Sequence, residues 1–303
     1  MPSTIDPSQF LSSSNAHRLA SEVRERCNAN QCPIPIESIA KKEEAIVKFA
    51  QILSDGALVR NKERHIIKIN EAIHLYRQRF TIAHELGHVL LDRMHQKFAN
   101  AHECSTGTFT NTNKEERFCD SFASHLLIPD KAIVEFSEWN GVSIRKLIRK
   151  AHELEVSLTP LIWRVLEQAP YKSGFLWFRM MPKPTDPNNL KLRLDWGVFP
   201  KSERIYLPKY DSVSKNSPIY QAFGSSEERV LKDVEVDFGS LRERRNLMVK
   251  AIGQAVLTIV LPKEIDPDIM FKRNKESLLP FMKFDEPEGE EDGIPRKSME
   301  CSP

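Results

Sequence analysis

The stretch RFTIAHELGHVLLDRM, from Arg79 to Met94, combines a metal-binding spacing with apolar flanks. His84 and His88 are four residues apart, so a helix places both side chains on one face. Their ring nitrogens can then meet at a point about 2.0–2.1 Å from each, which suits zinc. The neighbouring Glu85 cannot easily join this pair, but its carboxylate can accept a proton from water that a bound metal activates. The pattern therefore predicts a helix with a metal site and its own general base.

The residues around the two histidines favour a buried helix over a solvated one. A bare match to this spacing also occurs by chance on exposed helices, where the glutamate forms a salt bridge. Here the flanks are nearly all apolar, namely Ile82, Ala83, Leu86, Val89, Leu90 and Leu91. Two buried imidazoles without a metal or hydrogen-bonding partners would be energetically costly, so the flanks support the metal site.

A third ligand is expected, because catalytic zinc usually has three protein ligands. The stretch KEERFCDSFASHLLIP, residues 114–129, places Glu116 and Asp120 four apart on a predicted helix. Glu116 can serve as the ligand, while Asp120 can hold a ligand histidine from outside. Taken alone, this stretch is more typical of an amphipathic helix with solvated carboxylates. Glu115 is an alternative third ligand, and weaker candidates lie in a polar segment: His95, His102 and Glu103.

The two stretches together resemble the ImmA/IrrE-type metallo-endopeptidases, over roughly residues 14–168. The resemblance implies a zincin fold with a zinc ion held by His84, His88 and Glu116, and with Glu85 as the general base. One difference concerns Phe118, because many members of the family have a glutamate there. Glu116, four residues before the aspartate, is then the acidic position that remains. The implied substrate is narrow, typically a helix-turn-helix repressor that is cleaved to release its genes under stress or during mobile-element induction.

The predicted fold is α+β: a mostly helical zincin-like peptidase domain with a small sheet, followed by a β-rich α+β domain. Expected helices cover 14–28, a short segment from Ile36, 76–94, 114–127, 130–138, 143–153 and 158–168, with strands at 45–51 and 65–70. Residues 95–113 read as a loop. Later strands are expected at 173–181, 190–199, 203–208 and 234–239, and a helix leading into a strand at 242–261.

These elements divide the chain into four predicted parts. They are a flexible N-terminus (1–13), the metallopeptidase domain (14–169), a regulatory or partner-binding domain (173–283) and a disordered acidic tail (284–303). Within the second part, residues 143–168 could form a helix-turn-helix with several basic side chains: Arg145, Lys146, Arg149, Lys150 and Arg164. We favour the interpretation that this pair caps the peptidase core, because its second helix offers few side chains suited to base edges.

Composition points to a cytoplasmic protein without a membrane anchor. The 303 residues are 40% hydrophobic with a net charge of +2, which is ordinary for two globular domains and does not mark a nucleic-acid binder. The five cysteines are unpatterned, which suggests reduced thiols. The first 20 residues lack the features of a secretory signal, and the apolar run 255–261 is too short to span a bilayer.

Two other functions are compatible with these motifs. The chain could be a non-proteolytic regulator that uses the metallopeptidase fold to bind a protein partner or DNA, although such a protein has no need of Glu85. It could also be a zinc hydrolase that acts on a small amide. An open groove beside the metal site would favour a protein substrate, and a closed pocket a small one.

Overall fold

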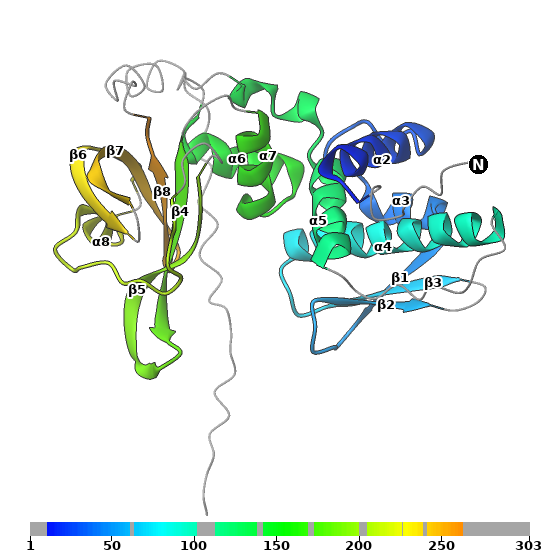
Figure 1. Ribbon diagram of the computed structural model, residues 1–303, viewed down its shortest axis with the longest axis horizontal. Coiled ribbons are helices and arrows are strands. Elements are labelled where there is room, and N and C mark those ends of the chain that lie inside the picture. Colours follow the sequence, from blue (N-terminus) through cyan, green and yellow to red (C-terminus); the bar gives the residue numbers. More distant parts are fainter. Residues whose placement is uncertain are drawn as a thin grey trace, which may run out of the picture. The chain divides into compact units, whose positions relative to one another are not determined.

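The computed structural model describes residues 11–60, 64–101, 113–137, 142–168, 173–199, 205–225, 227–238 and 241–262, apart from the side chains of 95–101, 238 and 241. The chain forms two compact units, residues 1–171 and 172–303 (Figure 1). The first is mostly helical and the second is rich in strands, so the predicted α+β class is confirmed. The predicted acidic tail and residues 1–10 of the predicted flexible N-terminus lie outside the described residues.

The first unit opens with two helices and a small sheet. Helix α2 (Ser13–Arg26) begins inside the predicted flexible N-terminus, because the Ser12 hydroxyl accepts a hydrogen bond from the Asn15 amide and caps it. Helix α3 (Ile36–Lys42) leads into strands β1 (Ala45–Ala50), β2 (Gly56–Arg60) and β3 (His65–Asn70). The strand order is β1-β3-β2, with β1 parallel and β2 antiparallel to β3. Strand β2 was not predicted, and it forms one edge of this sheet.

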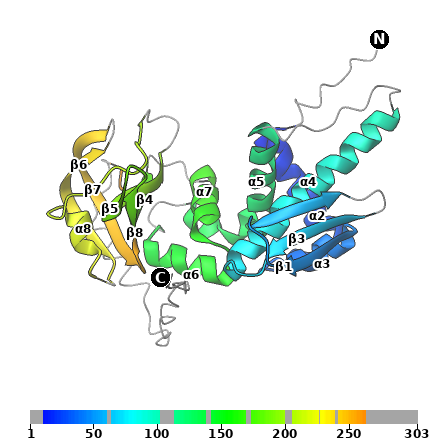
Figure 2. The same ribbon diagram turned by 90° about the horizontal axis from the view of Figure 1, so that it is seen from below.

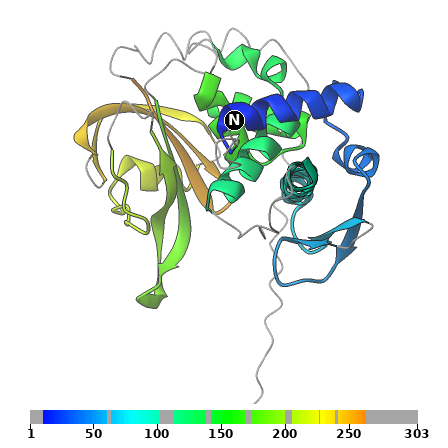
Figure 3. The ribbon, with the colours of Figure 1, turned by 45° about the vertical axis from the view of Figure 1, so that its right-hand side comes forward.

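Helix α4 (Leu75–Ala101) lies across one face of the sheet and contacts β2 and β3 (Figures 1 and 3). It is longer than predicted. Residues 95–101 were expected in a loop, but they contain no glycine or proline to end the helix. The rest of the predicted loop, 102–112, lies outside the described residues.

The remaining helices of this unit are α5 (Asn113–Leu127), α6 (Ile144–Leu154) and α7 (Leu158–Gln168). The helix predicted at 130–138 is wrong. After Pro129 the chain instead makes two short 3-10 turns, at Asp130–Ala132 and Val134–Phe136. Across the described part of the chain, no helix has both the length and the hydropathy needed to cross a bilayer.

Helices α4 and α5 approach closely at Gly87. A Cβ atom at this position would lie 3.1 Å from Cys119 Sγ and 3.2 Å from Phe122 Cδ1. Helix α5 also packs along α2, and its apolar face is buried, with Phe118 and Phe122 almost inaccessible to solvent. The missing side chain at Gly87 therefore allows α5 to reach the part of α4 that carries the two histidines.

The second unit is a five-stranded antiparallel sheet with a short helix. Its elements are β4 (Gly174–Lys183), β5 (Asp186–Val198), α8 (Pro218–Ala222), β6 (Arg229–Phe238), β7 (Leu241–Ile252) and β8 (Ala255–Val260), and the strand order is β5-β4-β8-β7-β6. Helix α8 contacts β6, β7 and β8 (Figure 2). The core includes side chains from most of these elements, among them Leu176, Phe178, Leu194, Ile219, Leu247 and Val256.

Two predictions for this unit are wrong. The helix expected from residue 242 is strand β7, which turns at Gly253 (φ +53°) into β8. All six residues of β8 are buried, so the run lacks the polar–apolar alternation that marks a half-exposed strand. In the expected strand 203–208, the described residues 205–208 form no ladder, although Ile205 and Leu207 pack against the core.

Candidate metal centre

The two histidines of α4 face away from its most buried stripe and toward α5. Ile82, Leu86 and Val89 are inaccessible or nearly so, which fixes the rotation of the helix. The His84 and His88 side chains keep 16% and 13% of their surface exposed. They therefore lie at the edge of the core, where part of each side chain is open to solvent.

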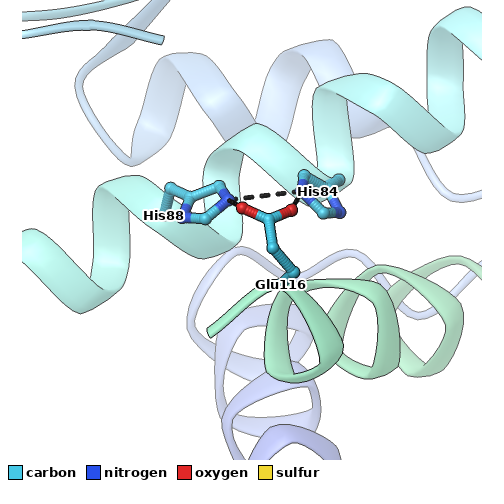
Figure 4. A group of neighbouring side chains, drawn as sticks. All are labelled: His84, His88 and Glu116. Carbon is cyan, nitrogen blue, oxygen red and sulfur yellow. Dashed lines mark hydrogen bonds and ion pairs between the residues drawn. The ribbon is translucent and has the colours of Figure 1, made fainter. Parts of the chain in front are cut away.

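Glu116, in the first turn of α5, completes a converging set of three donors (Figure 4). The two imidazole Nε2 atoms are 3.2 Å apart. The Oε2 and Oε1 atoms of Glu116 lie 3.3 Å from His84 Nε2 and 3.5 Å from His88 Nε2, respectively. Tetrahedral coordination with bonds of about 2.0–2.1 Å puts ligand atoms roughly 3.3 Å apart. The spacing and chemistry of these donors therefore fit a divalent metal such as zinc.

Asp120 holds the outer side of His84. Its Oδ1 is 2.9 Å from His84 Nδ1. An ionised carboxylate can only accept, so Nδ1 carries the proton and donates it in this bond. The lone pair of His84 is then on Nε2, which faces His88 and Glu116, as metal coordination requires.

The pKa values of the two rings are shifted in opposite directions. Burial lowers the pKa of His84, but the bond to Asp120 and the nearby carboxylates outweigh it and the pKa is raised. The pKa of His88 is lowered, first by burial and then by the charge of His84. A charge on His84 therefore opposes protonation of His88.

Glu85 lies beside this cluster in a pocket of about 340 Å³. The pocket is lined by residues of β2, α4 and α5: Gly56, Ala57, Leu58, Arg60, His84, Glu85, His88, Glu115 and Glu116. Burial raises the pKa of the Glu85 carboxyl, and Glu116 adds to the rise, although His84 opposes it. A raised pKa brings a carboxylate closer to the range useful for proton transfer near neutral pH.

The two candidate glutamates have different places. Glu115 is 6% exposed and lines the pocket, but the cluster of potential metal donors in the described residues contains Glu116. The weaker candidates His102 and Glu103, and the side chain of His95, lie outside what the structure describes. The geometry thus favours Glu116, as the four-residue pairing with Asp120 suggested.

Two residues of this region, Arg60 and Asp92, were not predicted from the sequence. Arg60 lines the pocket from β2, and its Nε donates a hydrogen bond to Asp92 Oδ2. A signal for Asp92 was present, because it follows His88 by the same four-residue step that separates the histidines. No sequence signal marked Arg60, since its position depends on the pairing of β2 with β3.

Comparisons with known proteins point to a peptidase family for the part of the chain that carries this cluster. Residues 45–161 match the peptidase family described as the IrrE N-terminal-like domain. The radiation response metalloprotease IrrE of Deinococcus radiodurans is 34% identical over 171 residues, which cover 56% of this chain and 50% of that protein. IrrE of Deinococcus deserti is 32% identical over 114 residues, covering 38% of this chain and 40% of its own. The chain thus spans half or less of the length of these relatives.

Among solved structures, a Mycobacterium tuberculosis transcriptional regulator aligns with a TM-score of 0.43 and 14% identity, over 82% of this chain and 76% of that one. A similarity of this size supports no conclusion about fold or function. The match of residues 45–161, by contrast, covers the helices that carry His84, His88 and Glu116, and the two relatives are similar over more than 100 residues each. Over this region the chain is similar to the ImmA/IrrE-type metallopeptidases.

Proposed function

We propose that the chain is a zinc-dependent endopeptidase in which His84, His88 and Glu116 hold the metal and Glu85 is the general base. The observation that supports this most is the converging set of two Nε2 atoms and one carboxylate, with near-tetrahedral spacing, next to the partly buried Glu85 carboxyl of raised pKa. A bound zinc ion supplies a Lewis acid that polarises a carbonyl and makes water a nucleophile at neutral pH.

Three parts of the chain have separate roles in this reaction: Glu85, Asp120 and the apolar stripe of α4. Glu85 takes a proton from the attacking water and passes it to the amine of the cleaved peptide bond. Asp120 accepts from His84 Nδ1 and so keeps the ligand tautomer and the ring orientation. The buried apolar stripe of α4 fixes the helix that carries His84, Glu85 and His88, which limits the movement of each.

A protein substrate fits this site better than a small amide. One wall of the pocket is the edge strand β2, which within the described residues pairs only with β3. An extended peptide can add to such an edge through main-chain hydrogen bonds. Gly56 brings the strand close to the general base, because a Cβ atom there would lie 3.4 Å from Glu85 Oε1.

The helix pair α6–α7 gives little support to direct DNA binding. Arg164, the only lysine or arginine on α7, is 3% exposed and pairs with Asp130 and Glu167. On α6, Lys150 pairs with Glu135 and Glu153. We therefore propose that the chain acts on a protein and not on DNA. The preferred substrate class is a helix-turn-helix repressor in the cytoplasm. For the second unit we propose a regulatory role.

The proposal can be tested by labelling new protein N-termini in a lysate of the source cell. Zinc-loaded parent protein and its Glu85→Gln variant are each incubated with the lysate, and labelled peptides are compared by mass spectrometry. The variant keeps the size and the metal ligands but has no base, so cleavage should fall by several orders of magnitude. Equal sets of new termini in the two samples would refute Glu85 as the base. Termini from proteins other than repressors would support a peptidase but change its substrate class.

A further inference from the structure

One residue of the pocket has no role in the reaction proposed for Glu85 and the metal. Arg60 stands at the end of β2, and among the described residues that line the pocket it is the one lysine or arginine. Its side chain is 55% exposed, so a ligand in the pocket can reach it. The other charged groups of the wall are the two histidines and three glutamates, which either bind the metal or carry negative charge.

The guanidinium of Arg60 is bound by a residue of α4, Asp92. Its Nε donates to Oδ2 of Asp92, whose side chain is only 10% exposed. The same oxygen lies 3.5 Å from His65 Nε2, so Asp92 is fixed on a second side. Asp92 follows His88 by one helical turn, and α4 therefore sets the position of Arg60 relative to the histidines.

Arg60 lies close to the reacting groups, because it lines the same pocket as Glu85, His84 and His88. The carboxylates of Glu115 and Glu85 add to the raised pKa of Arg60, after the hydrogen bond that it donates to Asp92. If the ion pair between Arg60 and Asp92 were purely structural, it would not need to lie close to the general base Glu85.

Attack of water on a peptide bond creates a negative charge on the carbonyl oxygen, which the positive charge of Arg60 can stabilise. As the water oxygen bonds to the carbonyl carbon, a proton of the water passes to Glu85. The π electrons of the carbonyl group move onto the carbonyl oxygen, which becomes negatively charged. Donors fixed in advance around that oxygen are usually among the largest contributions to catalysis. We propose that Arg60 is a catalytic residue that donates hydrogen bonds to this developing oxyanion, a role that rests on the proposed peptidase function.

The test uses ligand binding, so it does not depend on finding the substrate. Two probes share one Phe-Ala-Ala sequence: a phosphinate, whose charged oxygens imitate the tetrahedral oxyanion, and a mercaptoacyl analogue, which binds zinc through sulfur. Dissociation constants are measured for the zinc-loaded parent, Arg60→Ala and Arg60→Lys. We expect phosphinate binding to weaken about 100-fold in Arg60→Ala and less in Arg60→Lys, because lysine keeps the charge without the fork of donors. The mercaptoacyl probe should bind all three alike.

Arg77→Ala is the matched control. Arg77, on α4, pairs with Asp55 through a similarly exposed side chain but does not line the pocket, so both affinities should stay unchanged. Equal phosphinate affinity in the parent and Arg60→Ala would overturn the proposal, as would a parallel loss of both probes. A loss limited to the phosphinate supports it even if Glu85→Gln and the parent give identical lysate cleavage, so failure of the peptidase assignment is seen separately.

Discussion

The bond between Asp120 Oδ1 and His84 Nδ1 fixes which nitrogen of the ring can bind a metal. Replacing Asp120 with asparagine keeps the shape but removes the charge that favours this tautomer. Losses of about 10–100-fold in metal affinity are typical for such partners. We expect a loss in this range for Asp120→Asn, measured by zinc competition with a chromogenic chelator. Glu22→Gln, in an exposed pair with Arg18, is the control and should change nothing.

The adjacent glutamates allow a second test at single-residue resolution. Glu116 contacts both histidines, whereas Glu115 is buried in the pocket wall. Glu116→Ala should abolish stoichiometric zinc, because two remaining ligands seldom hold it tightly. Glu115→Ala should keep one zinc per chain by elemental analysis. The reverse result would move the third ligand to Glu115.

Residues on one helix were the easiest to predict, because the helical repeat alone brings His84, Glu85 and His88 together. Glu116 and Asp120 followed from the same rule on the next helix, although nothing in the spacing showed that the two helices would meet. Arg60 could not be foreseen, since a strand edge brings it to the site. Its connection to Asp92 crosses from sheet to helix, and only the packed structure shows it.

At the scale of elements, the contact between α4 and α5 decides whether the ligands meet. At Gly87 even a Cβ atom would crowd Cys119, so a valine there must push the helices apart. Overpacking of this kind typically costs about 1–3 kcal/mol. Gly87→Val should lower the free energy of unfolding of the first unit by this amount and also weaken zinc binding. Gly224→Ala should do neither, because no atom of the described residues, its chain neighbours aside, lies within 4 Å of the position that its Cβ would take.

Helices α2, α5 and α7 meet at His125, which should make their packing sensitive to acid. His125 is 5% exposed, stacks on His17 and donates from Nδ1 to the Ser121 carbonyl. Burial lowers its pKa, Arg164 and His17 add to this, and the Ser121 bond and Glu167 oppose it. Above pH about 6.5 folded and unfolded chains are both neutral here. Below it the unfolded chain gains a proton that the folded chain resists, so stability is lost.

His125→Gln should therefore cost stability at pH 7.5, because the bond to the Ser121 carbonyl is lost, and cost less at pH 5.5. Denaturant midpoints of the parent and variant, measured with chelator present, give the difference at each pH. A difference that narrows on acidification supports the lowered pKa of His125. A difference that widens would mean instead that protonation of His125 stabilises the folded chain.

Helices of the first unit were largely predictable from apolar periodicity, but the sheet elements were not. GALVR in β2 is short and lies between a turn and a charged segment, so its apolar run looked like part of a connection. Strands β7 and β8 are apolar over long runs, and period alone cannot separate such runs from a buried helix. Whether such a run forms a strand depends on the strand with which it pairs, and the sequence pattern of the run does not identify that partner.

For the whole molecule, the division into two units predicts that a bound metal stabilises the first unit and leaves the stability of the second unchanged. Ligand binding stabilises the folded state by about 2.7 kcal/mol when free ligand is 100 times the dissociation constant. Chelation should therefore speed amide hydrogen exchange in α4 and α5 and leave β7 and β8 unchanged. Equal acceleration in both units, measured by mass spectrometry, would show that their stabilities are coupled.

The placement of ligands on two successive helices has a consequence for chain connectivity. A metal shared by His84 and Glu116 closes a ring that runs through the backbone from one residue to the other. While the backbone is intact, the third ligand is supplied at the high effective concentration of an intramolecular group. A single break within the ring would turn this cross-link into an association between two fragments, and zinc retention would then fall on dilution.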